Sequence, residues 1–290
     1  MTSDQFGFNA FWWETLSTKA EIVAVTEELA GMGYRYIEWK DTSFAPDLAR
    51  GLRLAVDAGR DAGLRVSNLV MLRDPAGDDA DRAVADLKAA IDAAADCEIG
   101  ILNTNTGWPP PPGAADGEQW WMPPAPKTGL AWDRLFTSME AILKHAEARG
   151  VVIAIESVVG SMCHDFHSTE TLLRRFQSDA LALTFDPSHF FLSRDDIPWI
   201  IRHWGALIRH VHVKDAVGSP GVPGRDFLFP LLGEGGIDFS SMFAALEDIG
   251  YAGALSCEFE SFRYMHDVLQ NDYAAAARMT MDTLQKIWKT

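Results

Sequence analysis

The chain has 290 residues, of which 48% are hydrophobic, and a formal net charge of −16. So acidic a chain is expected to bind neither nucleic acid nor an anionic membrane surface, because both need a basic patch. Cys97, Cys163 and Cys257 are too few and too widely spaced for a disulfide framework or a zinc knuckle. No stretch approaches the roughly 20 apolar residues of a membrane span, and no signal-peptide pattern opens the chain, so we expect a cytoplasmic location.

Amphipathic helices alternate with short apolar strands along the chain. Eight strands are predicted, at 6–11, 34–39, 64–70, 99–103, 151–156, 181–186, 208–214 and 254–258. Eight helices are predicted between and after them, at 19–32, 48–62, 81–95, 132–149, 169–177, 199–205, 239–250 and 272–289. Gly33, Gly63 and Gly150 follow three of these helices, which is the expected stop signal.

Near-continuous apolar strands joined by helices are typical of a parallel sheet that is buried on both faces. Eight such units in 290 residues favour a closed (β/α)8 barrel, the TIM barrel, over an open doubly wound sheet. An open sheet usually carries a glycine-rich phosphate turn after its first strand, and Phe11-Trp12-Trp13-Glu14 has no glycine. We therefore predict a single α/β domain over residues 1–290.

Two long connections interrupt the alternation, at about 104–131 and 216–237. The first is rich in proline and tryptophan and the second in glycine. Both follow predicted strands, so both are expected to lie over the C-terminal face of the barrel, where such enzymes carry their active sites. Long loops in compact domains are often functional lids. The tryptophans would suit sugar rings and flat aromatic aglycones.

Four successive predicted strands end in side chains that can bind a metal ion: Glu156, Asp186, His212 and Glu258. Neighbouring strands lie about 4.8 Å apart, so four consecutive strand ends can surround one ion. Three carboxylates and one imidazole form an oxygen-rich site. Such a site suits Mn²⁺, with Mg²⁺ or Co²⁺ as alternatives, better than structural Zn²⁺.

The C-terminal half also resembles the xylose-isomerase-like TIM-barrel superfamily, which contains sugar phosphate isomerases and epimerases, ketose 3-epimerases, inosose dehydratases and 3-keto-glycoside or C-glycoside deglycosidases. The motifs that carry the resemblance are Ile155-Glu156, Asp186-Pro187-Ser188-His189, His210-Val211-His212-Val213-Lys214-Asp215, Leu232-Gly233-Glu234-Gly235-Gly236-Ile237-Asp238-Phe239 and Ser256-Cys257-Glu258-Phe259-Glu260. The N-terminal half matches only in its alternation of strands and helices.

The resemblance implies the same four metal ligands and a substrate contact at His189. In related ketose 3-epimerases the two ligand glutamates are also the acid/base pair, which implies Glu156 and Glu258 here. Those epimerases carry a further Glu shortly after the fifth-strand ligand, whereas residues 157–167 contain none. His164 and His167 are therefore candidate bases.

Further residues are candidates for binding the substrate or supporting the metal. The substrate-binding candidates are His189, Lys214, Arg225, Glu260, Trp13 and Trp108. Lys214 and Asp215 are also candidates for orienting His212, with a local salt bridge between the two as the alternative.

A divalent metal that binds a carbonyl and the adjacent hydroxyl makes the C–H bond between them more acidic by stabilising the enediolate. We predict a metal-dependent isomerase or epimerase that removes this proton from a sugar or polyol derivative through a metal-bound enediolate. The alternative is a lyase that eliminates water or the aglycone from a keto-sugar or glycoside.

A homo-oligomer, or a hetero-oligomer with a small subunit, is expected. An apurinic-endonuclease-type phosphodiesterase, which the net charge disfavours, and a catalytically silent binding subunit are further hypotheses.

Overall fold

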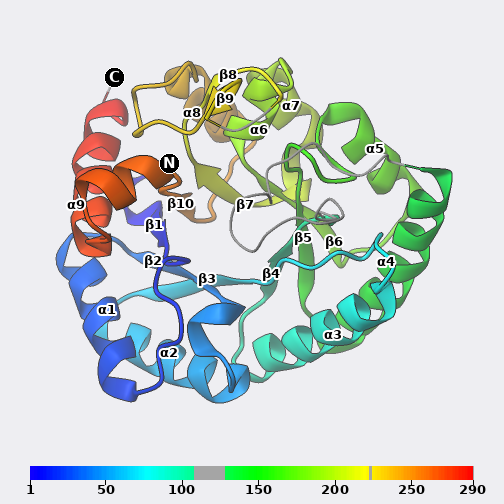
Figure 1. Ribbon diagram of the computed structural model, residues 1–290, viewed down its shortest axis with the longest axis horizontal. Helices are drawn as coiled ribbons and strands as arrows, with labels where there is room; N and C mark the ends of the chain where they lie inside the picture. The colour runs from blue at the N-terminus through cyan, green and yellow to red at the C-terminus, as the bar shows by residue number, and fades with distance from the viewer. Residues whose placement is uncertain (108–127, 222–223, 290) are drawn as a thin grey trace.

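The computed structural model describes residues 1–107, 128–221 and 224–289 and has eight parallel strands in a closed barrel (Figure 1). These strands are β1 (Phe6–Asn9), β2 (Tyr36–Lys40), β3 (Arg65–Val70), β4 (Ile101–Thr104), β5 (Val152–Glu156), β6 (Leu181–Phe185), β7 (Ile208–Val213) and β10 (Leu255–Cys257). Around the barrel they follow the order β1-β10-β7-β6-β5-β4-β3-β2. Each strand therefore pairs with the next in sequence and the last pairs with the first, which confirms the predicted (β/α)8 barrel.

Helices surround the barrel, and all eight predicted helices are present within a few residues of their predicted bounds (Figure 1). They are α1 (Lys19–Gly31), α2 (Leu48–Ala62), α3 (Ala80–Asp96), α4 (Gly129–Arg149), α5 (Phe166–Arg175), α7 (Ile197–Trp204), α8 (Phe239–Asp248) and α9 (Tyr273–Ile287). In the described parts of the chain, no helix combines the length and the apolar content that a bilayer crossing requires.

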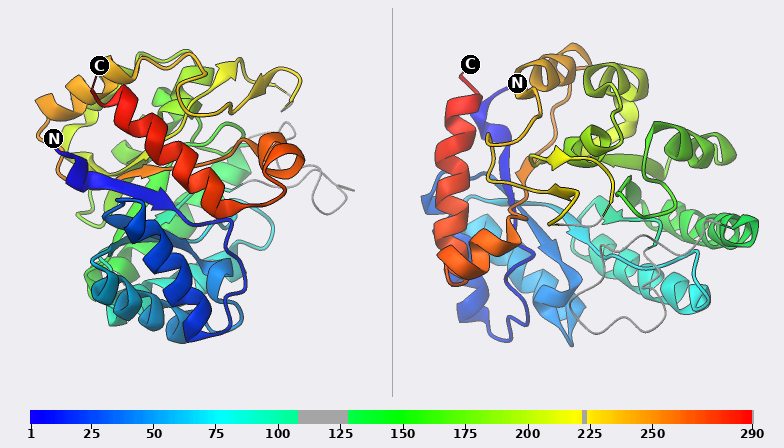
Figure 2. Two further views of the ribbon diagram at one scale, coloured as in Figure 1. Left: turned by 90° about the vertical axis from the view of Figure 1, so that its left-hand side faces the viewer. Right: turned by 45° about the horizontal axis from the view of Figure 1, so that its top comes forward.

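Local sequence explains where several helices begin and end. α2 and α4 stop at Gly63 and Gly150, whose φ angles of 78° and 68° lie in the left-handed region that favours glycine. The side chain of Asp272 accepts a hydrogen bond from the backbone N–H of Ala275 and so caps the start of α9. Figure 2 shows α9 running along the outside of the barrel. Just after α9, the ring of Trp288 packs edge-on against the ring of Phe6, with the ring centroids 5.3 Å apart.

The regular elements that were not predicted include one short α-helix and a pair of short strands. Asp186 caps a short helix, α6 (Pro187–Leu192), by accepting a hydrogen bond from the backbone N–H of Ser188 at 2.8 Å. The connection at 216–237, which we expected to be an irregular loop, contains two short antiparallel strands, β8 (Val217–Gly218) and β9 (Phe227–Leu228).

A buried carboxylate anchors this connection to the end of β7. Asp215 is 2% exposed and accepts hydrogen bonds from the backbone N–H groups of Ala216, Gly233, Gly235 and Ile237 at 2.8–3.3 Å. A Cβ atom on Gly235 would lie 2.0 Å from Asp215 Oδ1, so only glycine allows the backbone to approach this closely. The far end of the connection is thus tied to its beginning.

Replacing Asp215 with Ala should lower the free energy of unfolding of the metal-free protein by about 3 kcal/mol, because buried N–H donors lose their acceptor. Asp238→Ala is the matched control, since its exposed carboxylate also accepts a backbone N–H, that of Ser241, at the start of α8. Loss of this cap should cost about 1 kcal/mol. Urea unfolding measures both values, and equal losses would show that Asp215 does not hold the connection.

The barrel interior is unusually polar. Along β7, Val211 and Val213 alternate with His210 and His212, so the valines face the helices and the histidines face the barrel axis. Other buried polar side chains come from the remaining strands: Asn9, Glu38, Asn68, Asn103, Thr184 and Ser256. Branched apolar side chains usually fill this space in TIM barrels. The polar interior therefore marks a functional region that reaches from the C-terminal ends of the strands down into the barrel.

Candidate metal centre

Four ligand-type side chains converge at the C-terminal ends of consecutive barrel strands. Glu156 ends β5, Asp186 follows β6, His212 lies on β7 and Glu258 follows β10. One potential ligand atom from each residue lies within 4.8 Å of those of the other three. The four side chains therefore converge as predicted from their positions at strand ends, because the four strands are neighbours in the barrel.

Hydrogen bonds turn one oxygen of each carboxylate away from the centre. Asn103 Nδ2 donates to Glu156 Oε2 at 3.3 Å, and Asn9 Nδ2 donates to Glu258 Oε1 at 2.9 Å. The Asp186 oxygen that caps α6 is Oδ1, so Oδ2 remains toward the centre. Because hydrogen bonds fix one oxygen of each carboxylate, the other oxygen already faces the centre. The free-energy cost of ordering these carboxylates around a common ligand is therefore lower.

The imidazole of His212 completes the cluster. Its Nδ1 lies 3.3 Å from Glu156 Oε1, 3.6 Å from Glu258 Oε2 and 3.8 Å from Asp186 Oδ2. This nitrogen is buried and has no hydrogen-bond partner. A buried polar atom without a partner is costly. Three carboxylates and a buried nitrogen that faces them are therefore a donor set that fits a divalent ion.

Lys214 places an ammonium group beside these acids. Its Nζ lies 2.6 Å from Glu258 Oε2, 2.8 Å from Glu260 Oε2 and 2.8 Å from Asp186 Oδ2. Burial lowers the pKa of Lys214, but the surrounding carboxylates outweigh it and raise that pKa well above its usual value. The ring of Phe229, from the connection at 216–237, covers the ammonium at 4.6 Å from its centroid.

His189 presents a neutral imidazole to the same centre. Burial lowers the pKa of His189 to about 4, so the ring is uncharged at neutral pH. The backbone N–H of Val159 donates to Nδ1 at 3.4 Å, which leaves Nε2 to carry the ring hydrogen. Nε2 lies 3.5 Å from Asp186 Oδ2 and 3.9 Å from Glu156 Oε1. The side chain can therefore donate a hydrogen bond to a ligand held there.

Burial and neighbouring charges separate the pKa values of the two glutamates. Burial raises the pKa of Glu258 to about 8, although the Lys214 ammonium opposes this rise. Burial also raises the pKa of Glu156, but the nearby His212 imidazole, when it is protonated, outweighs burial and gives a net lowering. The two carboxyl groups therefore differ in proton affinity.

Several predicted site residues lie apart from this cluster. His164 bonds the carbonyl of Met162 and lies near Asp165, and His167 is exposed on α5. Exposed Arg225 pairs with its neighbour Asp226, while Trp13 packs against Phe8 and Tyr273. Trp108 lies outside the described residues. The roles suggested for these five residues stay predictions.

The side chain that contacts His212 Nε2 is Glu38 on β2, and the orienting role suggested for Lys214 and Asp215 stays a prediction. His212 Nε2 lies 3.1 Å from Glu38 Oε1, whereas Lys214 binds the acids and Asp215 binds the loop backbone. Glu38 was missed because it lies within a strand instead of at its end. Its one signal in the sequence is an acid amid the apolar residues of a predicted strand, Ile37-Glu38-Trp39.

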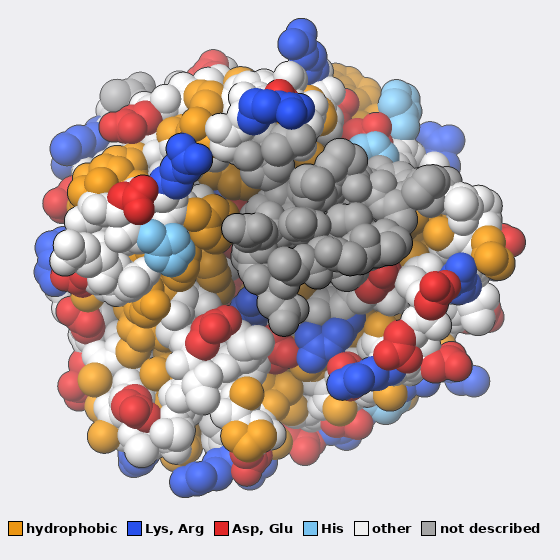
Figure 3. Space-filling view, in the orientation of Figure 1, with side chains coloured by type: hydrophobic (Ala, Val, Ile, Leu, Met, Phe, Trp, Pro, Cys, Tyr) orange, Lys and Arg blue, Asp and Glu red, His pale blue; other side chains and the backbone are white. Residues whose placement is uncertain are grey.

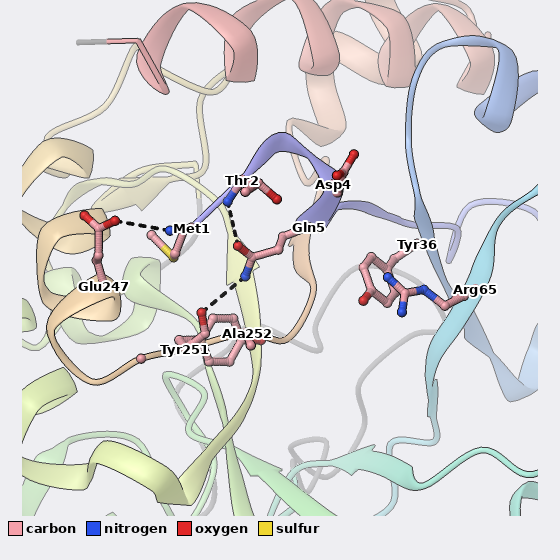
Figure 4. A pocket seen from close by; sticks show the side chains of 10 residues that line it. Met1, Thr2, Asp4, Gln5, Tyr36, Arg65, Glu247, Tyr251 and Ala252 are labelled. Atoms are coloured by element: carbon pink, nitrogen blue, oxygen red, sulfur yellow. Dashed lines mark hydrogen bonds and ion pairs between the residues drawn. The ribbon is translucent and has the colours of Figure 1, made fainter.

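A separate cavity of about 440 Å³ lies at the opposite end of the barrel (Figure 4). Its lining includes Gln5, Tyr36 and Arg65, which precede or begin strands β1, β2 and β3. Three of the charged groups there already have partners, since the guanidinium of Arg65 lies 4.3 Å over the Tyr36 ring and the terminal amine contacts Glu247. This cavity is therefore a poor candidate for catalysis, unlike the acidic cluster at the other end.

The closed parallel barrel and the acid–imidazole cluster at its C-terminal end together define a (β/α)8 protein with a candidate metal centre. The chain belongs to the xylose isomerase-like TIM barrel family, whose model matches residues 26–286. The resemblance seen in the motifs is thereby confirmed.

Curated relatives match about half of the chain, and the chain spans about half the length of these relatives or less. Inosose dehydratase of Lacticaseibacillus casei is 26% identical over 169 residues, which cover 54% of this chain and 55% of that protein. L-ribulose 3-epimerase of Mesorhizobium japonicum is 30% identical over 134 residues, covering 45% and 41%. A solved L-ribulose 3-epimerase superposes with a TM-score of 0.74 at 22% identity, covering 98% and 94% of the two chains, which supports the fold.

Proposed function

We propose that this protein is a divalent-metal-dependent isomerase or epimerase that removes a proton next to a carbonyl in a sugar or polyol derivative. The observation that carries the proposal is the convergence of Glu156, Asp186, His212 and Glu258 within 4.8 Å of one another. These four residues would hold the ion, with Mn²⁺ as the first choice and Mg²⁺ or Co²⁺ as alternatives. When bound, the ion would act as a Lewis acid on the substrate oxygens.

In this proposal the two glutamates would act as the acid/base pair. Glu156 and Glu258 lie at the two ends of the arc β5-β6-β7-β10, with Asp186 and His212 between them. Groups that flank a carbon from two sides can remove its proton from one face and return a proton to the other, which is epimerisation. Isomerisation would instead return the proton to the neighbouring carbon. His189 would donate a hydrogen bond from Nε2 to a substrate oxygen.

Elimination from a keto-sugar is the second candidate. It starts with the same proton abstraction, and similarity to inosose dehydratase favours it. The aromatic side chains Trp12 and Tyr273 also favour elimination, because aromatic surfaces suit flat aglycones. Trp12 stacks on Tyr273 with centroids 5.7 Å apart, and its Nε1 donates to the carbonyl of Phe259.

Proton NMR in D₂O would separate these reactions. Protein loaded with Mn²⁺ would be incubated with free ketoses, inosose and 3-keto-glucosides of aromatic alcohols, and the ion would be removed with chelator before the spectra are recorded. Deuterium next to the carbonyl of a rearranged sugar with an intact skeleton would support isomerase or epimerase activity. A released aglycone or a new alkene signal would support the lyase. No exchange with any of these substrates, despite bound metal, would count against both.

The charge of the site predicts an uncharged substrate. Glu156, Asp186, Glu258 and Glu260 crowd the site, and Lys214 is the only lysine or arginine among the buried residues of the described chain. A sugar phosphate should therefore have a kcat/KM at least about 100-fold below that of the free sugar, because like charges brought together cost several kcal/mol. Paired assays with a ketose and its phosphate test this expectation, and a preference for the phosphate would contradict it.

The remaining expectations also stay part of this proposal. They are a cytoplasmic location, a homo-oligomer or a complex with a small subunit, and the absence of nucleic-acid or membrane partners. On the face shown in Figure 3, Lys and Arg side chains are interspersed with Asp and Glu side chains around the rim.

A further inference from the structure

Glu38 lies beneath the candidate metal centre and makes four hydrogen bonds inside the barrel. Its carboxylate is 0% exposed. Oε1 lies 2.7 Å from Asn68 Nδ2 and 3.1 Å from His212 Nε2. Oε2 lies 3.0 Å from His210 Nε2 and 2.7 Å from Ser256 Oγ. The partners come from β3, β7 and β10, so one carboxylate joins strands across the barrel.

These contacts have two possible meanings. Glu38, His210 and His212 also have potential ligand atoms within 4.8 Å of one another, as a second ion site would require. Both oxygens of Glu38, however, already accept two hydrogen bonds each, and a second ion would have to displace buried donors at a cost. Because both oxygens of Glu38 already accept hydrogen bonds, Glu38 is better suited to positioning a neighbouring side chain than to binding a second ion.

His212 is the side chain that Glu38 would position. Its Nε2 faces Glu38 Oε1, which also accepts a hydrogen bond from Asn68 Nδ2, so Oε1 is the acceptor and Nε2 must carry the hydrogen. The lone pair of Nδ1 is then free for a ligand bond, and Nδ1 is the nitrogen that faces Glu156 and the other acids.

We propose that Glu38 is a positioning residue that fixes the tautomer and ring orientation of His212, so that Nδ1 is the metal ligand. This inference rests on the proposed function, since it requires an ion at the four-residue centre. Carboxylate–histidine–metal arrangements orient the ring and increase its basicity. His210, Ser256 and Asn68 would hold Glu38 in turn, because their donors fill its remaining acceptor positions.

The test compares Glu38→Gln with Ser256→Ala. The Gln side chain keeps the size of Glu38 but has one acceptor oxygen instead of two and no charge. We expect the dissociation constant for Co²⁺ to rise about 10- to 100-fold, as for other partners of metal-bound histidines. Ser256→Ala removes a donor from Oε2 and leaves the bond to His212, so its dissociation constant should change less than about 3-fold.

Two spectroscopic measurements separate positioning from loss of stability. At saturating Co²⁺, the visible absorption spectrum of Glu38→Gln should differ from wild type, because the His212 ring is no longer fixed. In the Zn²⁺-loaded protein, nitrogen-15 NMR should show a slowly exchanging Nε2–H on His212 in wild type that exchanges faster in Glu38→Gln. Glu38→Asp retains the charge but is one methylene shorter. It is the second variant if Glu38→Gln does not fold, and it should give an intermediate affinity.

The outcomes distinguish this inference from the proposed function. Wild-type protein that binds no divalent ion would overturn the proposed function and, with it, the role of Glu38. Wild-type binding with unchanged Co²⁺ affinity and spectrum in Glu38→Gln would overturn the inference alone. Two ions per wild-type chain and one per Glu38→Gln chain would overturn it in favour of a second metal site.

Discussion

Replacing Glu156 with Gln should reduce turnover by about 10³-fold even at saturating metal, because a positioned acid or base contributes about 10²–10⁴-fold. The amide cannot take up the substrate proton, and the site loses one of its three carboxylate ligands. The affinity for Mn²⁺ should also fall, since a neutral ligand replaces a charged one. Calorimetric titration measures the affinity, and deuterium incorporation from D₂O reports the proton-transfer step separately from the complete reaction.

Glu140→Gln is the matched control, because Glu140 is exposed on α4. It should change neither metal affinity nor deuterium incorporation. Full deuterium exchange in metal-saturated Glu156→Gln would show that Glu156 is not the base and would return attention to His164 and His167. Unchanged metal affinity would exclude Glu156 from the ligand set.

Patterns close together in the sequence were enough to predict the barrel and the convergence of the four candidate ligands. Strand periodicity and helix stops are local signals, and neighbouring parallel strands necessarily bring their ends together. Glu156, Asp186 and Glu258 could therefore be related without any knowledge of contacts. The order of strands around the barrel, which places His212 between Asp186 and Glu258, follows from the same regular connections.

The missed features depend on contacts between distant residues. Glu38 is separated from His212 by 174 positions and from Ser256 by 218, and no local pattern encodes those pairings. Asn9 and Asn103 likewise act on acids from other strands. The short helix α6 is different, because Asp186 followed by Pro187 is a recognisable start of a helix. Its six residues are too few for helical periodicity to show.

Local pairing explains why some predicted contacts were not found. Arg225 binds the adjacent Asp226 instead of reaching the acidic centre, and Asp215 is used entirely by the backbone of its own loop. Conversely, Phe229 reaches the centre from the same connection and lies 5.6 Å from the ring of His189. Charged residues farther along a loop are therefore weaker predictors of a site than polar residues on a strand or directly after its end.

Replacing Lys214 with Met should destabilise the protein strongly when chelator is present. Asp186, Glu258 and Glu260 would then share a buried region without their nearest positive charge. Breaking a buried ion pair by removing one partner costs about 3–5 kcal/mol. Urea unfolding of the metal-free variant should show a loss of this size. Lys144→Met, an exposed change on α4, should stay within about 0.5 kcal/mol of wild type.

A saturating divalent ion should reduce this loss to less than half, because the ion would supply positive charge to Asp186 and Glu258, two of the three acids that Lys214 contacts. Unfolding with and without Mn²⁺ therefore tests whether the ammonium and the ion share their carboxylates. An equal loss in both conditions would contradict a metal centre at these four residues. A loss that is small only with Mn²⁺ would mean that Lys214 and the ion jointly balance the charge of the acidic centre.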